Sequence, residues 1–141
     1  MFDECIKLKK KYIDYFGDYV GFKDMIEAFR QEGISYNSIF NEVQINQYED
    51  LVLIRYGLHE MGKGMWEDEN SPLREARSLV FNLRTEEMVL TPFRKFFNLN
   101  EVWETSTEVV EVKIKYCKIF EVSEKMDGSM QSYRWYNGEI V

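Results

Sequence analysis

The residues Lys125-Met126-Asp127-Gly128-Ser129 combine a basic side chain with a turn-forming sequence. A lysine amine is nucleophilic only when it is neutral, and burial or neighbouring cations lower its pKa from the usual value of about 10.4. Gly128 permits a tight backbone turn close to a ligand, and Asp127 is suited to accept a hydrogen bond or to help place a cation. Because Asp, Gly and Ser also favour ordinary β-turns, these residues alone predict a covalent catalyst and a plain turn about equally.

The spacing of Lys125, Asp127 and Gly128 resembles the KxDG motif of the covalent nucleotidyl transferases, which comprise the ATP- and GTP-dependent ligases and the mRNA capping enzymes. In that superfamily the lysine attacks the α-phosphate of a nucleotide and becomes joined to the nucleoside monophosphate. The resemblance therefore implies that Lys125 is a nucleophile. Arginine or lysine side chains and bound Mg²⁺ would stabilise the charge that develops on the phosphates.

Two segments upstream of Lys125 resemble the phage-type RNA ligase 1 family more specifically. Residues 91–101, TPFRKFFNLNE, are similar to the P-F-x-K-F-F-N-L-x-E segment of that family. Residues 75–81, EARSLVF, are similar to its E-x-R-G-hydrophobic-x-F strand, although Ser78 replaces the glycine, which affects how closely the backbone approaches a ligand. The three segments occur in the family's order, so the chain resembles the N-terminal part of an adenylyltransferase domain.

The resemblance implies a role for each matched position. Lys125 would be adenylylated, and Arg77 and Lys95 would contact the phosphates or the ribose of ATP. Phe97 matches a functional aromatic residue, whereas Phe96 is expected in the core; the alternative is that both rings only anchor the end of a strand. The implied cofactor-binding residues are Arg77, Lys95, Phe97, Glu124, Asp127 and Gly128, with Asn98 and Glu101 as supporting polar groups.

These resemblances imply ATP-dependent joining of a 5′-phosphate RNA end to a 3′-hydroxyl end through a lysyl-AMP intermediate. Glu124 would contact adenine, Mg²⁺ would be the second cofactor, and the partners would be RNA ends, with those of transfer RNA as one candidate. The implied fold is α+β, with N-terminal helices followed by antiparallel sheet that flanks an ATP cleft. The family's later motifs cannot fit into the 12 residues after Ser129. We therefore expect a truncated domain whose site is completed by a C-terminal part or a partner chain.

Two alternative functions remain open at this point. The chain is either a non-catalytic nucleotide- or RNA-binding module, such as one subunit of a split ligase, or another nucleotidyl transferase, such as a DNA ligase or a capping enzyme. The sequence KFFNLNE of residues 95–101 argues against the latter. His59 is the only histidine, so no zinc site or histidine-based triad is predicted. Gly62-Lys63-Gly64 lacks the spacing of a phosphate-binding loop.

The composition of the 141 residues is that of a folded, acidic protein. Apolar residues make up 45% and aromatic residues 16%, which excludes a disordered chain. The formal net charge is −7, but residues 71–141 carry 10 basic and 11 acidic side chains against 8 and 14 in residues 1–70. The charge therefore disfavours only broad binding to duplex nucleic acid. Free thiols at Cys5 and Cys117, and the lack of a signal peptide or membrane span, predict a cytoplasmic protein, in the host cytoplasm if a phage encodes it.

Hydrophobic spacing predicts one domain that is helical over residues 1–48 and β-rich over residues 49–141. The lysine run 9–11 is expected to be a solvated face. Trp66, Trp103 and Trp135 are expected to lie mostly in the core, with one or two near the cleft to stack on bases. The predicted elements are helices over 3–15 and from Phe22 to a stop at Gly33, a strand over 51–54, a helical turn after Ser71-Pro72, a hairpin of 77–83 and 88–90, a strand within 108–122, and a strand over 131–136 that turns at Asn137-Gly138.

Overall fold

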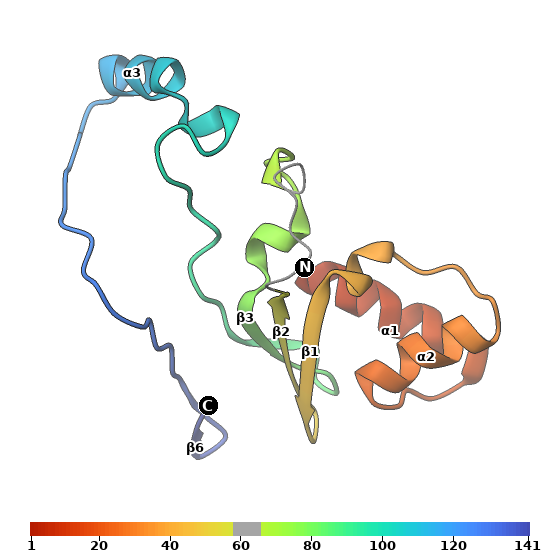
Figure 1. Ribbon diagram of the computed structural model, residues 1–141. Helices are drawn as coiled ribbons and strands as arrows, with labels where there is room; N and C mark the ends of the chain where they lie inside the picture. The colour runs from red at the N-terminus through yellow and green to blue at the C-terminus, as the bar shows by residue number, and fades with distance from the viewer. Residues whose placement is uncertain (58–65) are drawn as a thin grey trace.

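The fold is built around a four-stranded antiparallel sheet whose strands follow one another in sequence (Figure 1). The computed structural model describes residues 1–57 and 66–141. The elements are α1 (Phe2–Phe16), α2 (Phe22–Gln31), η1 (Ser38–Asn41), β1 (Val43–Tyr48), β2 (Leu51–Tyr56), η3 (Pro72–Glu75), β3 (Arg77–Asn82), β4 (Glu87–Leu90), η4 (Trp103–Thr105), α3 (Thr107–Tyr116), β5 (Trp135–Tyr136) and β6 (Glu139–Ile140), where η denotes a 3₁₀ turn. The α+β class predicted from the sequence is confirmed.

Helices α1 and α2 cover one face of the sheet and form the main core with it (Figure 1). In α2 the spacing of Phe22, Met25, Ile26 and Phe29 places them on one face, and all four side chains are buried. The helix ends as predicted, because Gly33 has a φ of 64° and its N–H donates to a carbonyl of the last turn (3.2 Å). Both predicted N-terminal helices are confirmed.

The central hairpin of the sheet also follows the sequence pattern. Strands β3 and β4 pair as predicted, and Ser71 caps the predicted helical turn η3 through its side-chain oxygen. Strand β1, however, lies in the region predicted to be helical up to residue 48, so that prediction is wrong for residues 43–48. Ile45 of β1 pairs with Ile54 of β2 and is buried in the core. Pairing with β2 therefore decides the structure of this polar segment.

The strand predicted within residues 108–122 is wrong, because residues 107–116 form α3. The alternating β-branched residues of this segment favour a strand by pattern alone. In the structure, Ser106 caps a helix instead, since its hydroxyl accepts a hydrogen bond from the N–H of Val109 (3.4 Å). Helix α3 contacts η4, and none of its side chains is buried. Figure 1 shows α3 at the far end of a long excursion of the chain away from the sheet.

The C-terminal hairpin packs on the face of the sheet opposite α1 and α2. Tyr136 of β5 is buried against Val80 and Val89 of the sheet. The turn residues Asn137 and Gly138 have φ values of 50° and 87°, which confirms the predicted hairpin turn. The strand predicted over residues 131–136 is shorter than expected, because only β5 belongs to it. The end of the chain is thus anchored to the sheet.

Two expectations about individual side chains are wrong. Lys9 is buried rather than solvated, because its Nζ donates to the carbonyl of Leu83 (2.7 Å) and to an acidic side chain in the β3–β4 turn (2.9 Å). Trp66 is buried as expected, but Trp103 and Trp135 are 73% and 68% exposed. The local apolar pattern does not reveal which side of each segment faces a core: the neighbouring residues Val102 and Tyr136 are buried instead.

The two cysteines are free thiols, as predicted. Burial raises the pKa of Cys5 to about 12, so this thiol is protonated at neutral pH. Within the part of the chain that the structure describes, no helix has the length and apolar character needed to cross a bilayer. His59 and Gly62-Lys63-Gly64 lie outside the described residues.

Candidate functional site

Strand β3 begins with a β-bulge at Ser78, the position where the RNA ligase pattern has glycine. Ile54 pairs with Leu79 and Arg55 pairs with Arg77, so Ser78 has no partner on β2. The φ of Ser78 is 73°, in the left-handed region that glycine adopts without strain. The left-handed backbone conformation at this position therefore explains why a glycine would suit it.

The bulge places Arg77 at the edge of a cavity of about 400 Å³ on the face of the sheet away from α1 and α2. The Arg77 guanidinium lies 4.9 Å from the centre of the Phe96 ring, and its Nη1 donates to the carbonyl of Arg94 (3.4 Å). The cavity is lined by Gln44, Arg55, Tyr56, Ala76, Arg77, Ser78 and Met130. Arg77 is thus oriented by Arg94 and Phe96 of the segment TPFRKFFNLNE, residues 91–101.

Lys95 contacts residues of its own segment. Its Nζ lies 3.7 Å from Oε1 of Glu101 and 4.8 Å from the centre of the Phe97 ring. Oε2 of Glu101 accepts a hydrogen bond from the N–H of Asn98 (2.7 Å). This bond, together with the charge of Lys95, holds the pKa of Glu101 below its usual value. Asn98 and Glu101 therefore form a turn whose carboxylate lies near Lys95.

The two adjacent phenylalanines point to opposite sides of this segment, as alternate residues of an extended chain do. Phe96, which was expected in the core, is 56% exposed and lies against Arg77. Phe97 is half-buried, with its ring 6.0 Å from that of Trp66 and 4.9 Å from the guanidinium of Arg74. The expectation for Phe96 is wrong, because Phe97 is the ring that packs against the core.

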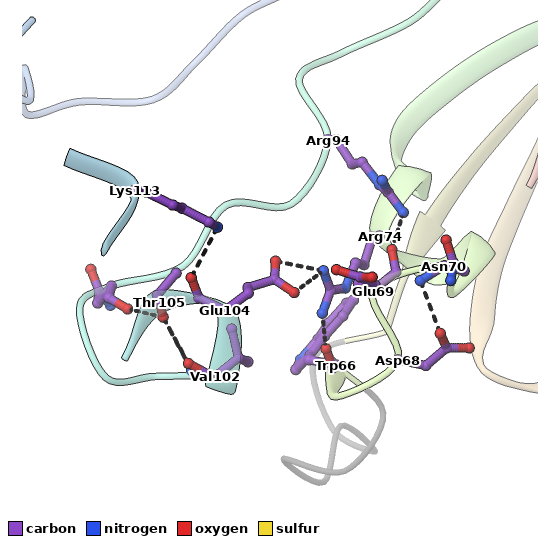
Figure 2. A network of polar contacts seen from close by, with 11 residues as sticks. Trp66, Asp68, Glu69, Asn70, Arg74, Arg94, Val102, Glu104, Thr105 and Lys113 are labelled. Carbon is purple, nitrogen blue, oxygen red and sulfur yellow. Dashed lines mark hydrogen bonds and ion pairs between the residues drawn. The ribbon is translucent and has the colours of Figure 1, made fainter. Parts of the chain in front are cut away.

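Arg74 ties this segment to the sheet, and the sequence analysis did not single it out. Figure 2 shows its guanidinium between Glu104 and Trp66, with Nη1 donating to both carboxylate oxygens of Glu104 (2.7 and 2.9 Å) and Nη2 donating to the carbonyl of Trp66. The carbonyl of Arg74 accepts from the N–H of Lys95 (2.7 Å). A charge pair 30 residues apart in sequence leaves no local pattern, so only the structure reveals it.

The KxDG residues lie in an exposed segment without regular secondary structure, residues 117–134. Oδ1 of Asp127 accepts the N–H of Gly128 (3.0 Å), whose φ of 135° forms a local bend. Glu124 and Lys125 are exposed, and they make no hydrogen bond or ion pair with residues 1–57 or 66–141. Met130, five residues after Lys125, lines the cavity beside Arg77.

The structure therefore places Arg77 against Phe96 and Lys95 against Phe97, and these two rings lie on opposite sides of the segment. Met130, five residues after Lys125, lines the cavity beside Arg77, whereas Lys95 and Phe97 do not line it. Among the residues that the structure describes, no group of three or more His, Cys, Asp or Glu side chains is placed to hold a metal ion.

Comparison with known proteins finds similarity to RNA ligases. Residues 75–141 match a family model described as RNA ligase. The chain is also 42% identical over 62 residues to a protein named "Putative RNA ligase" from Thermovibrio ammonificans, a match that covers 43% of this chain and 15% of that protein's length. No solved structure matches the chain significantly. The two sequence matches support a phage-type RNA ligase family.

Proposed function

We propose that this chain holds the part of an ATP-dependent RNA ligase site that carries the nucleophile. The proposal rests on the match of residues 75–141 to an RNA ligase family model. The observation that carries the proposal is the extent of the family match, which contains every proposed site residue from Arg77 to Gly128. ATP and RNA ends are the proposed substrates, and the cytoplasm is the proposed compartment. Mg²⁺ is proposed as a cofactor from the family resemblance alone.

Lys125 is the proposed nucleophile. Its neutral amine attacks the α-phosphorus of ATP, so that a P–N bond forms, the P–O bond to pyrophosphate breaks and the amine loses a proton. AMP then passes to the 5′-phosphate of an RNA end, and the amine regains its proton as the P–N bond breaks. Attack by a 3′-hydroxyl on that phosphate joins the RNA ends and releases AMP.

The described geometry supports bringing Lys125 to the cavity. Met130 lines the cavity beside Arg77, and five residues of extended chain span at most about 18 Å. Rotation of the exposed segment 117–129 can therefore place the Lys125 amine over the cavity while Met130 stays where it is. Arg77 then supplies a guanidinium for a phosphate oxygen.

The rest of the ligase site is proposed to come from outside this chain. The chain spans about 15% of the length of the relative that it matches. A C-terminal part of the same domain, or a partner chain, is proposed to supply the remaining groups. Binding of that part is expected to cover the exposed segment that carries Lys125 and to fix its position.

Incubation with ATP labelled at the α-phosphate tests the nucleophile. The chain is assayed alone and together with the proposed completing part, each as the wild type, as Lys125→Ala and as Lys118→Ala. Lys118 is an exposed lysine of the same segment, so its replacement controls for the loss of charge. Covalent label in the wild type and in Lys118→Ala, but not in Lys125→Ala, is expected. Label that survives in Lys125→Ala would reject the assignment.

A non-catalytic binding module is the second candidate, and the exposure of Lys125 favours it. Such a module would bind nucleotide or RNA through the cavity without covalent chemistry. It predicts saturable binding of ATP that is equal in the wild type and in Lys125→Ala, with no covalent label in either protein. The same labelled nucleotide, measured by equilibrium binding, separates this outcome from ligase chemistry.

A further inference from the structure

A row of polar side chains crosses three strands at one end of the sheet, on the face opposite α1 and α2. Gln44 of β1 pairs with Arg55 of β2, and Arg55 pairs with Arg77 of β3. Directly opposed residues of neighbouring strands lie close enough for their side chains to interact, and like charges in this arrangement are destabilising. The stability of the sheet therefore does not explain why two arginines face each other here.

Neither arginine is neutralised within residues 1–57 and 66–141. Nε of Arg55 donates to Oε1 of Gln44 (2.9 Å), and Arg77 contacts the Phe96 ring and a backbone carbonyl. No carboxylate of the described chain lies within ion-pair distance of either guanidinium. Elsewhere, the arginines with carboxylate partners are Arg30, Arg74, Arg84 and Arg134. The Arg55–Arg77 pair thus leaves hydrogen-bond donors and positive charge available for an anion.

The β-bulge is what creates this pair. Ile54 pairs with Leu79, so a regular antiparallel ladder would place Arg55 opposite Ser78. The bulge removes Ser78 from the ladder and brings Arg77 opposite Arg55 instead. It does so although Ser78 takes a left-handed φ of 73°, which is strained for a residue with a Cβ. The backbone strain at Ser78 therefore lies directly beside the charge repulsion between Arg55 and Arg77.

Both arginines line the cavity of about 400 Å³ described above. This volume lies in the range of small-ligand sites in proteins, which is about 300–1,000 Å³. The remaining wall includes Tyr56, Ala76 and Met130, so the cavity offers an apolar side next to a doubly cationic one. Such a combination suits a ligand that carries a phosphate on an apolar or aromatic body.

We propose that Arg55 and Arg77 together bind one terminal phosphate group, which makes Arg55 a phosphate-binding residue that neither the motif resemblance nor the family match singles out. Two planar guanidiniums can each donate two hydrogen bonds to phosphate oxygens, and the phosphate offsets their mutual repulsion. The identity of the molecule that bears this phosphate rests on the proposed function. The phosphate belongs either to the triphosphate of ATP or to the 5′-phosphate end of an RNA strand.

Binding measurements on the purified chain test the proposal with three probes: ATP, a short RNA with a 5′-phosphate, and the same RNA with a 5′-hydroxyl. Arg55→Ala is compared with Arg84→Ala, a control that removes an equal charge from an arginine in the β3–β4 turn that is paired with Asp50. Arg55→Ala is expected to weaken binding about tenfold or more, the loss typical of a hydrogen bond to a charged group. Arg84→Ala is expected to change it less than about twofold.

The three probes separate the sources of the phosphate. A loss confined to ATP identifies the nucleotide, and a loss confined to the RNA with a 5′-phosphate identifies the RNA end. Equal losses for the two RNAs would overturn the proposal, because Arg55 would then act only through general charge. No binding of any probe to the wild type, or equal losses in Arg84→Ala and Arg55→Ala, would also overturn it.

Thermal unfolding without ligand provides a second, independent measurement. Arg55→Ala relieves the repulsion with Arg77, so the Tm at low salt is expected to stay the same or to rise. A fall of several degrees would show that Arg55 supports the sheet instead of a ligand. The test is distinct from that of ligase function: a phosphate site can be confirmed while Lys125 takes up no label, and label transfer can succeed while Arg55→Ala binds normally.

Discussion

The described residues of 1–90 (1–57 and 66–90) and residues 91–141 are held in place in different ways. In the first region, α1, α2 and the four-stranded sheet bury a common core in which Phe22, Phe29 and Phe81 are fully enclosed. In the second region most large apolar side chains are exposed, and attachment depends on the Arg74–Glu104 ion pair and on the C-terminal hairpin. All proposed site residues except Arg55 and Arg77 come from the second region. The packed region therefore builds the cavity, while the loosely held region carries the proposed nucleophile.

The largest expected effect tests the packed region directly. Phe29→Ala removes a fully buried ring that contacts both α1 and the chain after α2, and it should lower the free energy of unfolding by about 3–5 kcal/mol. Phe120→Ala removes an exposed ring of the second region and should change it by less than about 0.5 kcal/mol. Denaturant unfolding measures both variants. Similar losses in the two would show that the regions do not differ as described.

The next effect concerns the link between the regions. Arg74→Ala removes a buried guanidinium and leaves Glu104 without its partner, so we expect a loss of about 2 kcal/mol of unfolding free energy. Hydrogen exchange should also accelerate at the amide of Lys95, which donates to the carbonyl of Arg74. Amides of α2 serve as the internal control and should keep their protection. Unchanged exchange at Lys95 would mean that other contacts hold the segment.

A smaller effect of opposite sign is expected at the bulge. Ser78→Gly relieves the left-handed φ of 73°, and it should raise the free energy of unfolding by about 0.5–1 kcal/mol. Ser78→Val should lower it by about 1 kcal/mol or more, because a β-branched side chain is poorly tolerated at positive φ. Thermal unfolding of both variants measures the difference. Destabilisation by glycine would show that the bulge is not strained.

The smallest effect is the pH dependence of the turn around Lys95. The pKa of Glu101 is lowered by the N–H of Asn98 and by Lys95, so its contribution to stability is present above the unfolded-state pKa near 4.5 and disappears as the pH falls through the lower folded value. The NMR shift of the Asn98 amide should therefore titrate below pH 4.5. In Glu101→Gln this titration should vanish. A midpoint above 4.5 would contradict the assigned contacts.

The sequence predicts the parts of this molecule that depend on local patterns. The apolar face of α2, the stop at Gly33, the β3–β4 hairpin and the turn at Asn137-Gly138 all follow from spacing or turn chemistry. It mispredicts β1, which is expected to be helical, because pairing with β2 decides the structure of that segment. It mispredicts α3, which is expected to be a strand, because capping by Ser106 overrides the alternation of the side chains.

The candidate site divides in the same way. The motifs identify Arg77, Lys95 and the KxDG residues, but they do not reveal which neighbours each side chain contacts. Arg55 and Arg74 could not be recognised as partners of distant residues, because the bulge at Ser78 and the ion pair to Glu104 are tertiary features. Phe96 is exposed, although it is expected in the core, for the same reason: an extended segment fixes the alternation of Phe96 and Phe97 but not which side faces the core.

The central claim is that the amine of Lys125 becomes bonded to AMP. Its most direct test is peptide mass spectrometry of the protein after incubation with ATP and Mg²⁺ in the presence of the proposed completing part. We expect an AMP adduct on Lys125 that is labile to acid, as a P–N bond is, and that is absent from Lys118. An adduct on another residue, or its persistence in Lys125→Ala, would contradict the claim.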